Sequence, residues 1–469
     1  MRCCVLCLLL LLSGPVSATE LATGLRPVIS SAPEGAALAV AVARADGGPL
    51  LFGHRATEPL SMASVTKIFV AAAALEALGP DFTFRTRLVG LGPANDGVLP
   101  GLGVIGGGDP CLDGHFTDRQ PDRIFEDWAA AILAQGITAI DGDLVIDASL
   151  FSGPIRPTTY PPGQGGSNLQ RWFSAPASAF AWNDNCIEIR VVPAQPGSPA
   201  VVEVRPRSPR ITIVNRTTSV ASGGSPNLIA YRHQNANTIV VSRSYSGGPT
   251  SWFPFAIHAD PDLLAGDHLK AILVEQGLPV SGTVRLGPVD TEGGPLLVDH
   301  RSPLIPALNI LNQRSQNFYG EQILRLIGHH HHQEGSIDAG CRAVMQTLTD
   351  MGIDTQGLAL LDGSGLSYGN LACAATIIDL LQHMHAHDHS QIFFESLRDR
   401  TISASGQNIT AKVKTGTLAI ANCLAGYIDG TDGTRYAFAF LANRGATANQ
   451  AWARPIINRL SSALMTATR

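Results

Sequence analysis

Ser64 and Lys67 are the first two residues in the chain whose types and spacing could do chemistry. Residues three apart on a helix share one face, so the amine of Lys67 can reach the hydroxyl of Ser64. A serine hydroxyl is a weak nucleophile until a base accepts its proton, and burial near other cations can lower the pKa of a lysine enough for that task. By itself this short pattern is more typical of a helix-capping serine with a solvated lysine.

Two more segments favour a catalytic role for Ser64 and Lys67 over a capping role. Ser315-Gln316-Asn317 opens a predicted helix, and Lys414-Thr415-Gly416-Thr417 lies on a predicted strand. Only four of the 33 basic residues are lysines, and Lys67 and Lys414 are two of them. A lysine kept among arginines indicates a need for an amine that can lose its proton. The three motifs in this order are typical of penicillin-binding proteins and serine β-lactamases.

Over nearly the whole chain after residue 18, the sequence resembles the low-molecular-mass class C penicillin-binding proteins, the D-alanyl-D-alanine carboxypeptidases and endopeptidases. Four further segments carry the resemblance: Gly106-Gly107-Gly108-Asp109-Pro110, Asn183-Asp184-Asn185, Asp362-Gly363-Ser364-Gly365-Leu366-Ser367 and Leu424-Ala425-Gly426-Tyr427. The resemblance implies an α+β fold with a transpeptidase-like core, similar to that of serine β-lactamases. In such a core an antiparallel sheet is flanked by helices and interrupted by inserted β-rich domains.

Two residues depart from the pattern of the family. Gln316 stands where many relatives have Asp, at a position that varies, and Tyr368 follows Ser367 where Arg is usual. The second departure leaves the substrate contacts at that point open.

Hydrophobic patterns agree with a core built from both ends of the chain. A hairpin over residues 36–51 precedes a helix over 64–78, and helical patterns return after residue 300. Three strands then follow, at 409–420, 424–428 and 435–442. We therefore predict these parts: a signal peptide at 1–18, a discontinuous catalytic domain at 19–85 and 290–469, and one or more inserted β-rich domains at 86–289.

The resemblance also implies roles for the motif residues. Ser64 attacks the carbonyl between two D-alanines, Lys67 accepts its proton, and Ser315 relays a proton to the departing amine. Asn317 holds the substrate amide, and Lys414 provides positive potential for the terminal carboxylate. Thr415, Gly416 and Thr417 bind substrate, and the backbone N–H groups of Ser64 and Thr417 form the oxyanion hole.

The first residues indicate export. Met1 and Arg2 precede an apolar run and the small-residue site Val16-Ser17-Ala18, which is typical of a signal peptide cut after Ala18. We therefore expect a periplasmic protein, and no later segment is long enough to span a bilayer. The net charge of -5 without a Lys/Arg block gives no support to nucleic acid as a partner. The resemblance implies peptidoglycan stem peptides as the substrate, with β-lactams as covalent inhibitors.

Neither a cofactor nor a metal is expected. Eight of the 14 histidines fall in two clusters, at 329–332 and at alternate positions in 383–389, but no carboxylate or cysteine stands at ligand spacing beside them. Five cysteines remain after the signal, an odd number without metal-ligand spacing.

Three other functions are kept as alternatives. A serine β-lactamase uses the same motifs but is usually a smaller chain. An esterase is suggested by Gly365-Leu366-Ser367-Tyr368-Gly369, which matches the nucleophile pattern G-x-S-x-G, although the strands after it read as a hairpin. A non-catalytic peptidoglycan-binding protein would not need Ser64, Lys67 or Lys414.

Overall fold

The first body of the protein is built on a six-stranded antiparallel sheet with the strand order β18-β19-β20-β21-β1-β2. The computed structural model describes residues 16–221, 227–445 and 450–468. Strands from both ends of the chain are neighbours, because β1 pairs with β21 over its whole length. The strands are β1 (Ala37–Arg44), β2 (Phe52–His54), β18 (Arg398–Ala404), β19 (Gln407–Thr417), β20 (Ala421–Asp429) and β21 (Arg435–Asn443).

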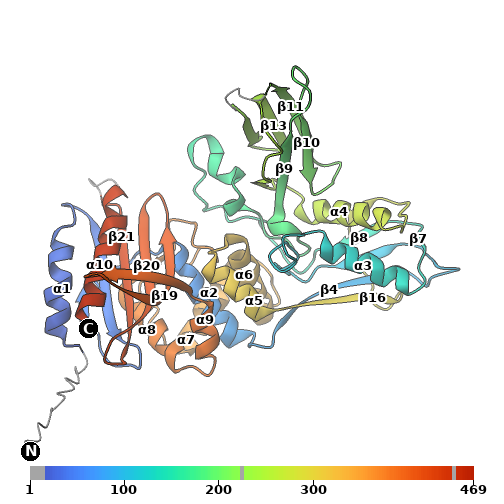
Figure 1. Cartoon of the computed structure of the whole chain (residues 1–469). Helices are drawn as coiled ribbons and strands as arrows, with labels where there is room; N and C mark the ends of the chain where they lie inside the picture. The colour runs from blue at the N-terminus through green and yellow to red at the C-terminus, as the bar shows by residue number, and fades with distance from the viewer. Residues whose placement is uncertain (1–15, 222–226, 446–449, 469) are drawn as a thin grey trace, which may run out of the picture.

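Alternate residues of the central strands enter two different cores. On β21, Phe438 and Phe440 pack on one face of the sheet, and Ala437 and Ala439 pack on the other. Helices α1 (Ala18–Ser30) and α10 (Ala453–Ala467) cover the phenylalanine face (Figure 1). Small side chains on the opposite face allow helices to approach closely. The helices that share its core are α2 (Thr66–Ala77), α5 (Leu304–Gln313), α6 (Asn317–His332), α7 (Ile337–Asp350), α8 (Ala374–Ala386) and α9 (Ser390–Ser396).

Helix α2 lies in the middle of this second core. Every residue from Thr66 to Leu75 is buried, as expected of a helix that is apolar on all sides. A short 3-10 turn, η1 (Ala63–Val65), precedes it. The predicted helix after Ser64 is therefore confirmed, and so is the hairpin between β20 and β21.

A second body lies between α2 and α5 in the sequence. Its main sheet has the order β15-β8-β6-β4-β16, and β4 and β16 lead into it from the core (Figure 1). The domain boundary predicted between residues 85 and 86 falls within β4. The other boundary, predicted between residues 289 and 290, comes before β16, the partner of β4. The elements of this sheet are β4 (Thr83–Gly90), β6 (Leu102–Ile105), β8 (Leu144–Asp147), β15 (Val284–Leu286) and β16 (Leu296–Pro303), with α3 (Arg123–Ala134) and α4 (Pro261–Glu275) packed on them.

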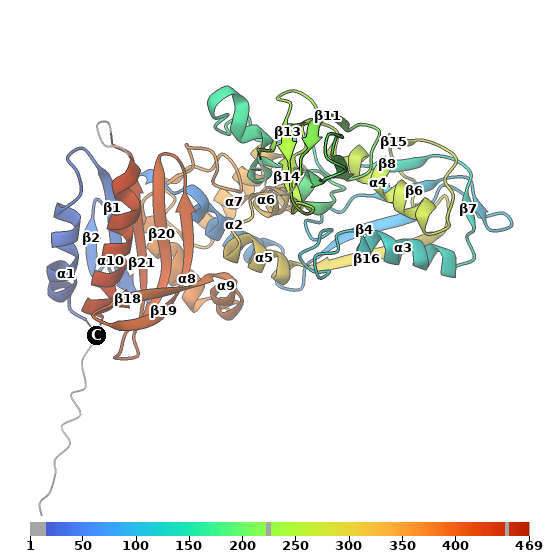
Figure 2. The same ribbon diagram turned by 45° about the horizontal axis from the view of Figure 1, so that its top comes forward.

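Two three-stranded sheets stand beside that layer (Figure 2). They have the orders β10-β9-β14 and β11-β13-β12, and both contribute to one small core. Their strands are β9 (Cys186–Val192), β10 (Val201–Arg205), β11 (Thr212–Ser219), β12 (Ile229–Arg232), β13 (Thr238–Tyr245) and β14 (Phe253–Ala256). The inserted region is thus rich in strands, as predicted, but its described residues also include two α-helices, α3 and α4.

Short elements complete the described chain. The two-residue strands pair as β3 (Leu60–Ser61) with β17 (Leu371–Ala372) and β5 (Val98–Leu99) with β7 (Ala139–Ile140). The remaining 3-10 turns are η2 (Gln164–Gln170), η3 (Trp172–Ser174), η4 (Asn183–Asn185) and η5 (Gln450–Trp452). Within residues 16–221, 227–445 and 450–468, no helix has the length and hydropathy needed to cross a bilayer. The predicted signal peptide lies outside the described residues except for 16–18.

Candidate active site

Ser64 lies in the 3-10 turn at the start of α2, between that helix and the end of β19. The turn begins sharply, because Ala63 has a left-handed backbone with φ of 48°. Thr66 Oγ1 donates a hydrogen bond to the Ala63 carbonyl at 2.8 Å and fixes the turn. The buried helix thus presents one hydroxyl at a defined point.

Lys67 lies one helical turn further on and is fully buried. Its Nζ atom donates hydrogen bonds to Ser64 Oγ at 3.0 Å, to Asn317 Oδ1 at 2.8 Å and to the carbonyl oxygen of Ser364. Burial lowers the pKa of Lys67 from 10.5 to about 7, although the nearby carboxylates of Asp362 and Glu321 act in the opposite direction. A neutral amine is therefore accessible near neutral pH, within reach of the serine proton.

Ser315 and Lys414 form a second hydroxyl–amine pair. Lys414 Nζ donates to Ser315 Oγ at 2.7 Å and to the Thr415 carbonyl oxygen at 2.8 Å. Ser315 sits between α5 and α6 with a left-handed φ of 59°. Burial, then the charges of Lys67 and Arg398, hold the pKa of Lys414 well below its ordinary value. The site thus contains two buried amines, each bonded to a serine hydroxyl.

The inserted region accepts two hydrogen bonds from the motif that contains Ser315. Asn317 Nδ2 donates to the carbonyl oxygen of Phe173 at 2.8 Å, and Gln316 Nε2 donates to Asp184 Oδ2 at 2.6 Å. Gln316, the residue that departs from the pattern of the family, therefore faces a carboxylate of the inserted region. An amide can donate to this carboxylate, whereas an ionised Asp at the same position could not.

Two glycines allow the backbones around Ser64 to approach each other. A Cβ on Gly416 would lie 2.7 Å from the Met62 carbonyl oxygen and 3.2 Å from the Ser64 amide nitrogen. A Cβ on Gly365 would lie 2.1 Å from the Ala63 carbonyl oxygen. No side chain fits at either point, so strand β19 and the loop over residues 362–369 both contact the turn that carries the nucleophile.

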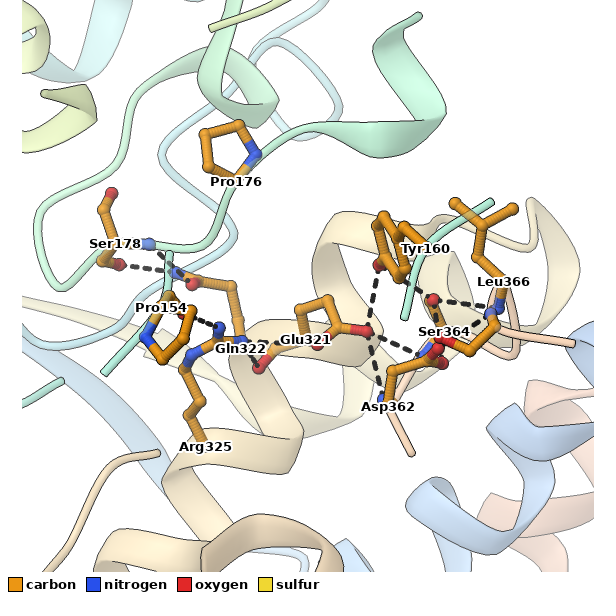
Figure 3. Close-up of polar contacts among 12 residues, drawn as sticks. Pro154, Tyr160, Pro176, Ser178, Glu321, Gln322, Arg325, Asp362, Ser364 and Leu366 are labelled. Atoms are coloured by element: carbon orange, nitrogen blue, oxygen red, sulfur yellow. Dashed lines mark hydrogen bonds and ion pairs between the residues drawn. The ribbon is translucent and has the colours of Figure 1, made fainter. Parts of the chain in front are cut away.

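A buried acidic pair, Glu321 and Asp362, lies beside Ser364 (Figure 3). Both carboxylates accept from the Ser364 amide, at 3.1 Å for Glu321 Oε1 and 3.0 Å for Asp362 Oδ1. The carbonyl of the same residue, Ser364, accepts from Lys67 Nζ. Burial, then the charge of Asp362, raises the pKa of Glu321 to about 7. The pair therefore positions the Ser364 carbonyl and acts electrostatically on Lys67.

Tyr160 connects this pair to the inserted region, as Figure 3 shows. Its hydroxyl donates to Glu321 Oε1 at 3.1 Å and lies 2.9 Å from Ser364 Oγ. Arg325, on the same helix as Glu321, donates to Glu321 Oε2 at 3.3 Å. Sequence reasoning assigned no role to Tyr160, Glu321 or Arg325. The available signal was spacing, because Asn317, Glu321 and Arg325 follow one another at i+4 on one face of α6.

A cleft of about 540 Å³ opens above Ser64. Ser315, Asn317 and Thr417 line it together with Ser64, and its apolar walls are Trp172, Phe173, Leu366 and Leu418. Thr415 lies elsewhere: with Gly416 and Thr417 it lines a second cavity, beside α10. Of the eight predicted site residues, four therefore line the cleft: Ser64, Ser315, Asn317 and Thr417. Lys67 and Lys414 are hydrogen-bonded to Ser64 and Ser315, and Gly416 packs against the turn that carries Ser64, whereas Thr415 is not part of the cleft lining.

The other candidate residues lie apart from the cleft floor. Ser367, the centre of the esterase pattern, is fully buried, and its hydroxyl lies 2.6 Å from Thr159 Oγ1. His329 to His332 form the last turn of α6, and His387 pairs with Glu76 at 2.9 Å.

Among the described residues, one group of three could share a metal: Asp113, His115 and Asp184. Arg314 donates to Nδ1 of His115 at 2.8 Å, which leaves the proton of a neutral ring on Nε2, the atom that faces the carboxylates. In this tautomer Nε2 of His115 carries a proton that points toward Asp184, so it does not offer a lone pair to a metal. In the same described residues, Cys111, Cys186, Cys341, Cys373 and Cys423 are free thiols.

Comparison with known proteins gives consistent matches over almost the full length. The model of the "D-Ala-D-Ala carboxypeptidase 3 (S13) family" matches residues 21–463. The chain is 31% identical to a D-alanyl-D-alanine carboxypeptidase of Actinomadura sp. (strain R39) over 436 residues, covering 87% of this chain and 78% of the relative.

Solved structures agree with this fold. The crystal structure of penicillin binding protein 4 (dacB) from Haemophilus influenzae superposes with a TM-score of 0.75 at 24% identity, covering 96% of this chain and 99% of the other. The same protein complexed with a β-lactam gives a TM-score of 0.72 with the same coverage.

Proposed function

Because the chain belongs to the D-Ala-D-Ala carboxypeptidase 3 (S13) family, we propose that it hydrolyses the peptide bond between two D-alanines in peptidoglycan stem peptides. The resemblance inferred from the three motifs is confirmed at the level of the family and of the fold. The proposal goes further, since it assigns the substrate and the residue that forms the covalent intermediate, Ser64.

One observation carries the proposal: the 3.0 Å contact between Lys67 Nζ and Ser64 Oγ, with a lysine pKa of about 7. In the acylation step Ser64 Oγ bonds to the carbonyl carbon, and its proton passes to neutral Lys67. The backbone N–H groups of Ser64 and Thr417 stabilise the oxyanion, and one such donor is typically worth about 3–4 kcal/mol. The tetrahedral intermediate then breaks its carbon–nitrogen bond.

The proton that Lys67 took from Ser64 passes through the Ser315 hydroxyl, which touches Lys414, to the leaving amine, so that Lys67 is neutral again. An ester on Ser64 remains. Water then attacks that ester, its proton passes to Lys67, and Ser64 regains a proton as the shortened peptide leaves. Lys67 ends each cycle neutral, and one water is consumed per bond cleaved.

The same chemistry makes the chain a target of β-lactams. A β-lactam carries a strained amide that Ser64 can open, but the acyl group stays attached because the leaving group remains tethered to it. The Haemophilus influenzae relative complexed with a β-lactam supports this part of the proposal. The sequence pattern at Val16-Ser17-Ala18 supports a periplasmic location, where peptidoglycan is found.

Labelling with a fluorescent penicillin tests the proposal. The native protein should retain the label through denaturing electrophoresis, and Ser64→Ala should not. Full labelling of Ser64→Ala would contradict the assignment of the nucleophile. Rapid loss of label from the native protein would instead indicate a β-lactamase. Mass spectrometry of a pentapeptide should then show the loss of one alanine.

A further inference from the structure

A second cavity, of about 450 Å³, lies against the same strand that carries Lys414. Thr415, Gly416 and Thr417 form one side of it, and β18 and the first turns of α10 form the others. Three guanidinium groups line this basic pocket: those of Arg398, Arg400 and Arg454.

The positive charges of the basic pocket are poorly neutralised. Its one carboxylate, Asp399, is paired with Lys412 at 2.8 Å. Arg400 donates to the neutral amide of Asn458 at 2.7 Å. Among the described residues, Arg398 and Arg454 make no ion pair. Burial, then the charges of Arg454 and Arg398, lowers the pKa of Arg400, so these groups are close enough to repel one another.

The basic pocket adjoins the candidate active site at the end of β19. Strand β18 begins at Arg398, opposite Val413, so residues 414–417 of β19 extend past the end of their neighbour. One backbone edge of this segment is therefore not covered by β18. Thr417 lines both the cleft above Ser64 and the basic pocket. Arg398 is near enough to Lys414 to lower its pKa.

The chemistry of the two cavities indicates which half of a substrate each cavity would bind. A substrate whose scissile carbonyl lies at Ser64 and Thr417 can extend into the cleft on one side and the basic pocket on the other. The cleft has apolar walls, including Trp172 and Leu366, and it is lined by one guanidinium group, that of Arg314, whereas the basic pocket is lined by three. The leaving group lies on the carboxyl side of the bond, so it carries the terminal carboxylate. Opposite charges attract, so the leaving half belongs in the basic pocket.

The size and charge of the pocket exceed what a single D-alanine needs. Lys414 is already close to where the terminal carboxylate would lie, and a free amino acid has only one carboxylate. Three arginines in about 450 Å³ match a larger and more acidic group. Guanidinium groups also bind carboxylates by paired hydrogen bonds, which adds selectivity for that group.

We propose that the basic pocket is a leaving-group subsite that recognises a second carboxylate, so that the enzyme favours the release of an acidic peptide over the release of one D-alanine. This inference rests on the proposed function and adds a preference to it. It also bears on the choice between trimming a stem peptide and cutting a cross-link, because only the second reaction releases a peptide.

Two synthetic peptides with the same acyl half test the subsite. One ends in D-Ala-D-Glu and the other in D-Ala-D-Gln, so the leaving residues match in size and differ by one charge. At low salt the native enzyme should show a kcat/KM for D-Glu about fivefold above that for D-Gln, the scale of one partly solvated charge pair. Added salt should reduce this ratio by screening.

Variants locate the effect. In Arg398→Gln and in Arg454→Gln the ratio should fall toward one. In Arg459→Gln, which changes an arginine on α10 that donates to Ser31 and does not line the pocket, the ratio should remain native. Equal kcat/KM for the two peptides in the native enzyme, or an unchanged ratio in both pocket variants, would overturn the subsite.

Failure of the proposed function gives a different result from failure of the subsite alone. Cleavage of neither peptide, with no penicillin label on Ser64, would overturn the hydrolase and the subsite together. Cleavage of both peptides at equal rates, with normal labelling, would overturn the subsite alone.

Discussion

The Nζ atom of Lys67 lies 2.8 Å from Oδ1 of Asn317, and the other end of that amide is bonded to the inserted region. An amide oxygen accepts a hydrogen bond from either protonation state of an amine and adds no charge. Asn317 therefore orients Lys67 without stabilising the ammonium form as a carboxylate would.

Asn317→Asp should raise the pKa of Lys67, because a carboxylate next to an amine favours its charged form. Acylation by penicillin at pH 7 should fall about tenfold for each unit of that rise, and the rate should recover at higher pH. Stopped-flow acylation rates from pH 6 to 9 measure both effects. Asn408→Asp, at the exposed start of β19, serves as the control, and an unmoved pH profile in Asn317→Asp would contradict this role.

The plot of acylation rate against pH should have an inflection near pH 7, which is set by the pKa of Lys67. Its amine must be neutral to accept the proton of Ser64, so the rate should rise as pH passes the lysine pKa of about 7. Lys67→Arg keeps a cation but cannot lose its proton, and acylation should fall at least about 100-fold. A native rate that is flat between pH 5.5 and 8.5 would argue against Lys67 as the base.

Glu321→Gln should move the same inflection toward lower pH. The negative charge of Glu321 raises the pKa of Lys67, and glutamine removes that charge while its oxygen can still accept from the Gly363 and Ser364 amides. The pH profile distinguishes this electrostatic effect from simple loss of structure, which would lower the rate at every pH. The exposed Glu334→Gln is the matched control. An identical pH profile of acylation in both variants would show that Glu321 does not affect the pKa of Lys67.

Gly416→Ala should separate β19 from the nucleophile. The added Cβ would lie 2.7 Å from the Met62 carbonyl oxygen and 3.0 Å from the Ala63 Cβ, so the strand must move. A shift of about 1 Å at a reacting centre can cost about a hundredfold in rate, so acylation should fall on that scale. Gly248→Ala, where nothing lies within 4 Å, should acylate as the native protein does. Native rates in Gly416→Ala would show that the contact is not needed.

The predicted motif residues lie together because each motif carries its own local geometry. Ser64 and Lys67 share a helix face, and Lys414 and Gly416 share a strand face, so spacing alone was informative. Thr415 illustrates the limit of this reasoning. It is adjacent to Lys414, yet it lines the second cavity and not the cleft above Ser64.

Contacts between distant segments could not be predicted in this way. The Glu321–Asp362 pair joins residues 41 positions apart through the Ser364 amide, and no local pattern encodes that meeting. Helix α1 was also missed, because the signal-peptide pattern ends where the helix begins, at Ala18. Its buried residues Leu21 and Leu25 face a sheet that forms only when β21 pairs with β1.

Phe173 and Asp184 accept hydrogen bonds from Asn317 and Gln316, and Tyr160 donates one to Glu321. Because of these bonds the inserted region is not independent of the start of α6. A shortened chain without residues 86–289 would leave Gln316, Asn317 and Glu321 each lacking an acceptor or a donor. It would also lack the aromatic wall formed by Trp172 and Phe173. Grafting this region onto another core, or exchanging it between relatives, would therefore alter the nucleophile's surroundings as well as the outer surface.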